Sequence, residues 1–150
     1  MKKFIYAVFA VLTLGLTCVA CGDDNEDAVY NYGTTPEQAT AGTYTGMWVR
    51  TSDEGTETYD GSVTIAAGGS AGVANITFSC PSSEINATSI ANIWNSNNDF
   101  QFVNQVEGNG LGAAFAGRVY ADGKLNTSFT ITQRVGRKQV KMSYEFIGSK

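Results

Sequence analysis

The sequence of 150 residues contains no histidine, only three cysteines and only two prolines. Without histidine, no serine or cysteine nucleophile can use an imidazole base, and a zinc site loses one of its two main ligand types. The cysteines alone are too few to make a metal site. Leu111 and Leu125 are the only leucines after position 41, where threonine, glycine and aromatic residues dominate. This composition favours β-strands over helices.

The charged residues exclude further functions. Glycoside hydrolysis needs two carboxylates across a cleft, and the sequence gives no means of choosing such a pair among its acids. The ten lysines and arginines are too few and too scattered for a nucleic-acid surface. We therefore expect a protein that is not an enzyme and that uses no metal, cofactor or nucleic-acid partner.

Residues 1–20 are typical of a secretory signal peptide. Lys2 and Lys3 form a short positive head, and the apolar run from Phe4 to Ala20 follows directly. That run falls short of the roughly 20 residues that a membrane-spanning helix needs, and no later segment approaches this length. The sequence therefore predicts export from the cytoplasm.

Cys21 follows Val19 and Ala20, and this arrangement resembles the lipobox of bacterial lipoproteins. The resemblance implies that the Cys21 thiol is lipidated and holds the protein on a membrane through acyl chains. Cys18 fits the pattern less well, because Leu16 and Thr17 precede it, and an ordinary signal peptide is the alternative. With Cys21 lipidated, Cys80 has no partner for an intramolecular disulfide.

An acidic cluster follows Cys21, and residues 21–41 as a whole are interpreted as a tether and linker. The cluster consists of Asp23, Asp24, Glu26 and Asp27. It resembles the export signal of Bacteroidetes surface lipoproteins, which implies a location on the cell outer membrane, facing the exterior. The alternative is a solvated spacer without an address.

Residues 42–150 are expected to form one all-β domain. Apolar side chains alternate with polar ones in several segments, as in strands with one buried face. The alternating apolar positions are Ile76 and Phe78; Phe100, Phe102 and Val106; Leu125, Phe129 and Ile131; and Val140, Met142, Tyr144 and Phe146. Three more strands are expected from Gly42, Thr56 and Leu111 onward. Residues 85–95 fit either a strand or a short helix, because Ile90, Ile93 and Trp94 also have helical spacing.

Short turns connect these segments in sequence order. Asp122-Gly123 is a two-residue hairpin signal, and Gly136-Arg137 and Gly68-Gly69-Ser70 mark two further turns. Successive hairpins give an antiparallel meander, and closure removes its two exposed edges. We therefore expect an eight-stranded antiparallel up-and-down barrel, with a β-sandwich as the alternative.

The segments AGTYTGMW, FAGRVYADGKLNTSFTI and VKMSYEFIGSK resemble the lipocalin-like, or calycin-like, β-barrel domains of Bacteroidetes lipoproteins. Gly46-Met47-Trp48 is similar to the Gly-x-Trp of the first lipocalin strand. The resemblance implies that Trp48 closes the barrel base beneath a basic side chain of the last strand. The available bases are Arg134, Arg137, Lys138 and Lys141. The alternative is an ordinary buried tryptophan.

Small residues predict space inside the barrel. The segment GNGLGAAFAG has glycine or alanine where other strands have large side chains, for example at Ala113 and Gly117. An eight-stranded barrel is near the size that either fills itself or holds one small ligand. The predicted binding residues for a small apolar molecule are Trp48, Tyr59, Phe115, Thr127, Phe129 and Tyr144. The alternative is a filled barrel that contacts a surface protein or glycan.

Overall fold

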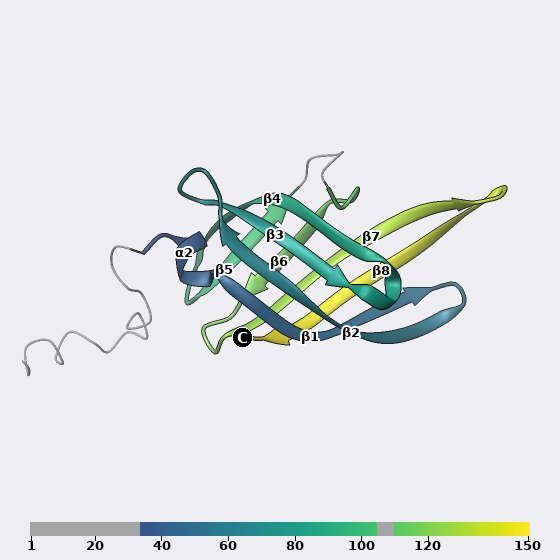
Figure 1. The fold of residues 1–150 in the computed structure, drawn as a ribbon, viewed down its shortest axis with the longest axis horizontal. Coiled ribbons are helices and arrows are strands. Elements are labelled where there is room, and N and C mark those ends of the chain that lie inside the picture. Colours follow the sequence, from purple (N-terminus) through teal and green to yellow (C-terminus); the bar gives the residue numbers. More distant parts are fainter. Residues whose placement is uncertain (1–33, 105–109) are drawn as a thin grey trace, which may run out of the picture. The chain divides into compact units, whose positions relative to one another are not determined.

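The structure is a computed structural model that describes residues 34–104 and 110–150 (Figure 1). A short helix, α2 (Pro36–Thr40), precedes eight strands. The strands are β1 (Gly42–Ser52), β2 (Gly55–Ala67), β3 (Val73–Cys80), β4 (Ile85–Ser96), β5 (Asp99–Asn104), β6 (Phe115–Val119), β7 (Lys124–Val135) and β8 (Lys138–Ser149). A 3-10 turn, η2 (Pro81–Ser83), joins β3 to β4.

The eight strands form a closed antiparallel barrel in sequence order. Each strand pairs with the next, and β8 returns to pair with β1 from Thr45↔Ser149 to Thr51↔Ser143. Gly123 and Gly136 adopt positive φ angles of 83° and 64° in the two last hairpin turns, a conformation that glycine adopts at little cost. The predicted up-and-down barrel is confirmed, and the sandwich alternative is wrong.

Residues 85–96 form a strand, which decides between the two interpretations of this segment. β4 pairs with β3 on one side and with β5 on the other. Ile93 is buried, whereas Ile90 and Trp94 are 61% and 41% exposed. This alternation has the period of two that a strand requires, so the helical spacing of these residues was coincidental.

The strand expected from Leu111 onward begins later than predicted. β6 starts at Phe115, and residues 111–114 form a turn and its exit. The Leu111 amide donates a hydrogen bond to the Ser89 hydroxyl at 3.1 Å, and Leu111 is buried against the core. The small residues at positions 112–114 therefore serve a connection, not a strand.

Helix α2 lies within the segment that the sequence assigned to the linker. Pro36 occupies its first turn, where a missing N–H costs nothing, and the Thr40 hydroxyl donates to the Pro36 carbonyl at 2.8 Å. The Glu37 carboxylate accepts a hydrogen bond of 2.9 Å from the amide of Gly72 in the β2–β3 turn. The helix is thus fixed to one end of the barrel, called here the helix end.

Two hairpins extend beyond the opposite end, called here the hairpin end (Figure 1). β7 pairs with β6 only as far as Phe129, but it continues to pair with β8 to Val135. β2 pairs with β3 only from Ser62, although its pairing with β1 begins at Gly55. Both protrusions exist because β7 is longer than β6 and β2 is longer than β3.

Candidate functional site: the barrel interior and the hairpin end

Trp48 stands at the centre of an aromatic interior. Its side chain is fully buried, and its indole Nε1 donates to the Ser79 carbonyl at 3.0 Å. Four rings surround it with centroid distances between 5.0 and 6.5 Å, and these belong to Phe78, Phe129, Tyr144 and Phe146. The contacts with Phe129 and Tyr144 are edge-to-face, a geometry that adds to the stabilisation that burial provides.

The interior glycines lie against aromatic rings of the same strand or of a neighbouring strand. A Cβ on Gly61 would lie 2.5 Å from Cδ1 of Trp48, and one on Gly148 would lie 2.5 Å from Cζ of Phe146. A Cβ on Gly117 would overlap the Phe102 ring. The space that the sequence predicted at Gly117 is therefore occupied by an aromatic side chain, as protein interiors are close-packed.

The structure brings most of the predicted binding residues together. Phe129 stacks on Tyr144 at 5.1 Å, and both rings meet Trp48 edge-on. Phe115 reaches the same cluster through Phe78 at 4.8 Å. Thr127 is buried, but its hydroxyl donates to the Ala116 carbonyl at 2.8 Å. This hydrogen bond uses the Thr127 hydroxyl that was predicted to orient a ligand.

Tyr59 is partly buried against the core, opposite Trp48, and its hydroxyl belongs to a polar group at the hairpin end. Arg50 pairs with Glu57, and the Tyr59 hydroxyl donates to the same carboxylate at 2.6 Å. The Arg50 guanidinium also lies over the Tyr59 ring, 5.5 Å from its centroid. The hydrogen bonds from Tyr59 and Arg50 lower the pKa of Glu57, and the Glu57 carboxylate raises the pKa of Tyr59. These charges favour polar contacts at this end.

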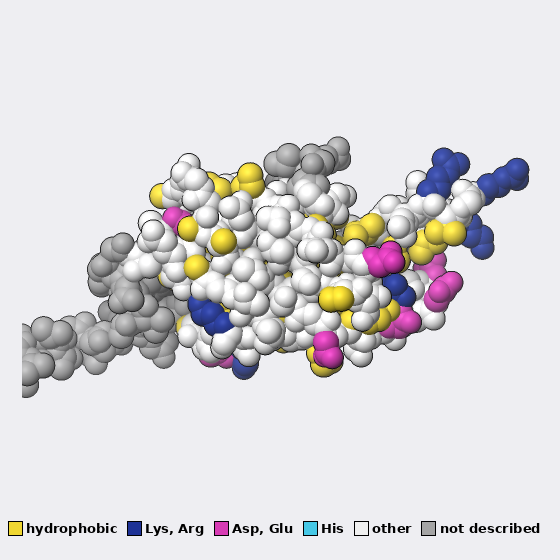
Figure 2. Space-filling view, viewed as in Figure 1, with side chains coloured by type: hydrophobic (Ala, Val, Ile, Leu, Met, Phe, Trp, Pro, Cys, Tyr) yellow, Lys and Arg dark blue, Asp and Glu magenta, His cyan; other side chains and the backbone are white. Residues whose placement is uncertain are grey.

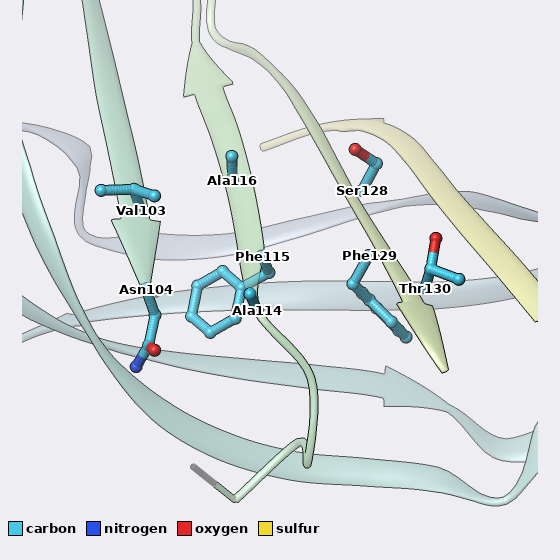
Figure 3. Close-up of a pocket in the computed structure, with 8 residues that line it drawn as sticks. All are labelled: Val103, Asn104, Ala114, Phe115, Ala116, Ser128, Phe129 and Thr130. Atoms are coloured by element: carbon cyan, nitrogen blue, oxygen red, sulfur yellow. The ribbon is translucent and has the colours of Figure 1, made fainter. Parts of the chain in front are cut away.

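An open groove of about 490 Å³ borders the start of β6 (Figure 3). It lies where β6 begins, at the point where the pairing between β6 and β7 ends. Its lining consists of Val103, Asn104, Ala114, Phe115, Ala116, Ser128, Phe129 and Thr130. Phe115 and Phe129, both predicted as binding residues, therefore contribute to a groove at the rim of the barrel. The other lining residues were not predicted, because a groove between strands depends on where each strand ends.

The two protruding hairpins differ in charge. Arg134, Arg137, Lys138 and Lys141 are all exposed at the tip of the β7–β8 hairpin. In Figure 2, lysine and arginine side chains gather on that projecting end, while acidic side chains gather nearer the β1–β2 hairpin. The turn between β1 and β2 contains Asp53 and Glu54. The hairpin end thus has separate basic and acidic projections.

The predicted basic partner of Trp48 is wrong. The residue of β8 that lies opposite Trp48 is Phe146, and the four bases lie beyond it, toward the hairpin tip. At the helix end, Lys150 Nζ lies 5.4 Å from the centroid of the Tyr44 ring. The Tyr44 hydroxyl donates to the Thr40 carbonyl at 2.7 Å, and burial raises its pKa to about 12. At this end of the barrel, the cation over an aromatic ring is therefore Lys150 and the ring is Tyr44.

The cysteine prediction is tested only in part. Cys80 is buried and free, as the sequence predicted. Cys21 and the acidic residues Asp23, Asp24, Glu26 and Asp27 lie outside the described residues. Within residues 34–104 and 110–150, no helix is long and apolar enough to cross a membrane.

Comparisons with known proteins give one informative match. No family model and no curated protein matches the chain. A solved structure from Bacteroides fragilis, described as a "putative outer membrane protein", superposes with a TM-score of 0.60 and 18% sequence identity. The match covers 79% of this chain and 54% of that one, so this chain spans about half of its neighbour's length. At this identity the likeness shows a shared fold.

Proposed function

We propose that this protein is an outer-membrane lipoprotein, anchored through Cys21 and exposed on the cell exterior. The lipobox-like residues before Cys21 and the acidic cluster after it support this location. The likeness in fold to a B. fragilis protein described as a "putative outer membrane protein" is consistent with it. The lipid anchor would be the contact with the membrane, and the barrel would be the exported domain.

We further propose that the barrel is a non-catalytic interaction module that contacts a surface protein or glycan. The observation that carries this proposal is the match between rings and glycines, of which Phe102 against Gly117 is the clearest case. Because aromatic side chains occupy the interior, binding groups must be presented on the surface. The charged hairpins are the most distinctive surface features of the described residues.

A small apolar ligand is the second candidate function. The groove beside Phe115 and Phe129 favours it, because ligand sites are concave and lined by apolar groups with a few polar ones. Such a ligand would sit at the rim, over these two rings, instead of in the centre of the barrel.

Replacement of Phe129 separates the two functions. In a filled barrel, Phe129→Ala should cost roughly 3–5 kcal/mol of unfolding free energy, because it opens a cavity in a packed core. The wild-type protein should then not enhance the fluorescence of the apolar dye 1-anilinonaphthalene-8-sulfonate. Ile90→Ala is the matched control, since Ile90 is exposed and should leave both measurements unchanged. Dye binding by the wild type that is lost in Phe129→Ala, with a much smaller loss of stability, would favour the apolar-ligand function.

A further inference from the structure

The β7 strand has a free edge beyond Thr130. The Tyr120 amide donates to the Lys124 carbonyl at 2.8 Å, and this bond sets the phase of the ladder between β6 and β7. Because hydrogen bonds alternate along an antiparallel strand, the even-numbered residues of β7 direct their N–H and C=O groups toward β6. Past Phe129 there is no β6 residue to receive them. Ala114, directly before β6, lies opposite Thr130 and lines the same groove, so the backbone groups that face the open side are those of Thr132 and Arg134.

Gly110 and Leu111, in the connection that precedes β6, do not cover this edge. Leu111 binds the Ser89 hydroxyl, and Gly110 is in contact with the Thr88 carbonyl, so both residues lie against β4. Among the described residues, β7 pairs with β6 only as far as Phe129. Four residues, Thr132–Val135, thus make up an exposed strand edge.

The charge beside this edge has one sign. Arg134, Arg137, Lys138 and Lys141 lie within eight positions, and no acid occurs between Phe129 and Tyr144. The ion pairs in the described part of the chain use other bases, namely Arg50, Arg118 and Lys124. Two copies of this edge would bring like charges together, which disfavours pairing with a second copy. Charge complementarity favours an acidic partner.

The groove at the start of β6 continues the same edge. Its lining includes Ser128 and Thr130 of β7 and Ala116 of β6, so it lies where an added strand would meet the barrel wall. Small side chains at Ala114 and Ala116 leave room there for one side chain of an incoming segment. Strand addition gains affinity from backbone bonds and specificity from such pockets.

We propose that β7 binds an extended acidic peptide segment of a partner protein, which adds as a strand along Thr132–Val135. This inference rests on the proposed interaction function and names the class of partner. Free backbone groups on alternate residues repeat at about 6.8 Å along β7, a spacing that an extended peptide reproduces. The four bases select acidic side chains, and the groove receives a residue at the end nearer β6.

The test uses the mature protein and a synthetic decapeptide of alternating threonine and glutamate. A γ-linked glutamate oligomer of the same charge and heparin serve as anions that cannot form a strand ladder. Backbone amide hydrogen exchange is measured by NMR at Thr132 and at Gln133. The Thr132 amide faces the free edge, whereas the Gln133 amide faces β8 by the same alternation. The decapeptide should slow exchange at Thr132 and leave Gln133 unchanged, and the other two anions should slow neither.

Two variants of one residue provide the matched comparison. Thr132→Pro removes the N–H at the free edge without removing a hydrogen bond to β8, whereas Thr132→Ala keeps that N–H. Proline should weaken decapeptide binding about tenfold or more, and alanine by less than about twofold, because only proline deletes a donor. If Thr132→Pro fails to fold, the exchange measurement on the wild type decides the question.

Three results would overturn the proposal. These are equal binding of heparin and decapeptide, an unchanged affinity in a folded Thr132→Pro variant, or a dimer that forms through this edge. Failure of this inference is distinguishable from failure of the proposed function. A protein that is not anchored to the membrane, or an interior that binds the dye, would be detected in experiments that use no peptide. A barrel that is anchored and filled but binds no acidic strand would refute this inference alone.

Discussion

At the residue scale, the interior is organised by pairs of one large ring and one glycine. Phe102 lies over Gly117, and Phe146 lies over Gly148, so neither glycine leaves a void. The sequence predicted correctly that Phe102 and Phe146 face inward, because alternation decides the face of a strand. It did not predict that Phe102 fills the gap at Gly117, because that contact depends on the register between β5 and β6. The candidate pocket at Gly117 was therefore misjudged, although Phe129 and Tyr144 were correctly placed together.

Substitution of Gly117 tests this packing. Gly117→Ala should lower the free energy of unfolding by about 1–3 kcal/mol, because the new methyl group would overlap the Phe102 ring in a filled core. Gly69→Ala is the matched control, since a Cβ there meets nothing within 4 Å. Urea denaturation followed by tryptophan fluorescence measures both. Equal midpoints for the two variants would contradict a filled interior.

At the scale of secondary structure, the strands could be predicted and the short elements could not. Alternating apolar residues and the Asp122-Gly123 and Gly136 turns indicated the meander, because both signals are local. Helix α2 has only five residues, too few for a helical period to be visible. It is stabilised by contacts distant in sequence, such as Glu37 with Gly72. The free edge of β7 was also unpredictable, since it arises from the difference in length between β6 and β7.

The contact between Glu37 and Gly72 makes the stability of the helix end depend on pH. The neighbouring Thr35 hydroxyl, together with backbone N–H groups that include that of Gly72, lowers the pKa of Glu37 below its ordinary value of 4.5. A carboxyl group with a lowered pKa in the folded state stabilises the fold above its unfolded pKa. That contribution is lost as the pH falls through the folded pKa. The anchoring of α2 should therefore weaken in acid.

Glu37→Gln tests this dependence. At pH 7 the free energy of unfolding of the variant should be about 1 kcal/mol below that of the wild type. A neutral amide accepts the hydrogen bond from the Gly72 amide less strongly than a carboxylate does. The difference between wild type and variant should shrink as the pH falls below 4.5. The exposed Glu54→Gln change is the control, and it should have no effect at either pH. A constant difference over the whole pH range would contradict the role given to the carboxylate.

At the scale of the whole molecule, the barrel and the N-terminal segment were predicted from different kinds of sequence signal. The barrel of residues 42–150 could be predicted from composition and periodicity, because burial forces side chains to alternate. The signal peptide, Cys21 and the acidic cluster were interpreted by resemblance, and they remain predictions because they lie outside the described residues. Enzyme activity likewise stays untested, and its expected absence depends on the residue types in the sequence.

Lipidation of Cys21 predicts a simple change in fractionation. Cys21→Ala should move the protein from the membrane fraction to a soluble fraction, because acyl chains bind at about 0.8 kcal/mol per buried methylene and no anchor would remain. Cys18→Ala is the matched control and should leave the protein on the membrane. Immunoblots of separated fractions and the mass of the N-terminal peptide measure the outcome. Membrane retention of Cys21→Ala without any lipid mass would refute the anchor.

The acidic cluster predicts on which side of the membrane the barrel lies. Replacing Asp23, Asp24, Glu26 and Asp27 with alanine should leave lipidation intact but remove the proposed signal for export to the cell surface. Protease added to intact cells should then digest the wild-type barrel and spare the variant. Replacing Asp53 and Glu54 with alanine controls for loss of acidic charge as such, because that turn lies on the barrel. Equal digestion of all three proteins would show that the cluster is a solvated spacer, which is the ordinary behaviour of such runs.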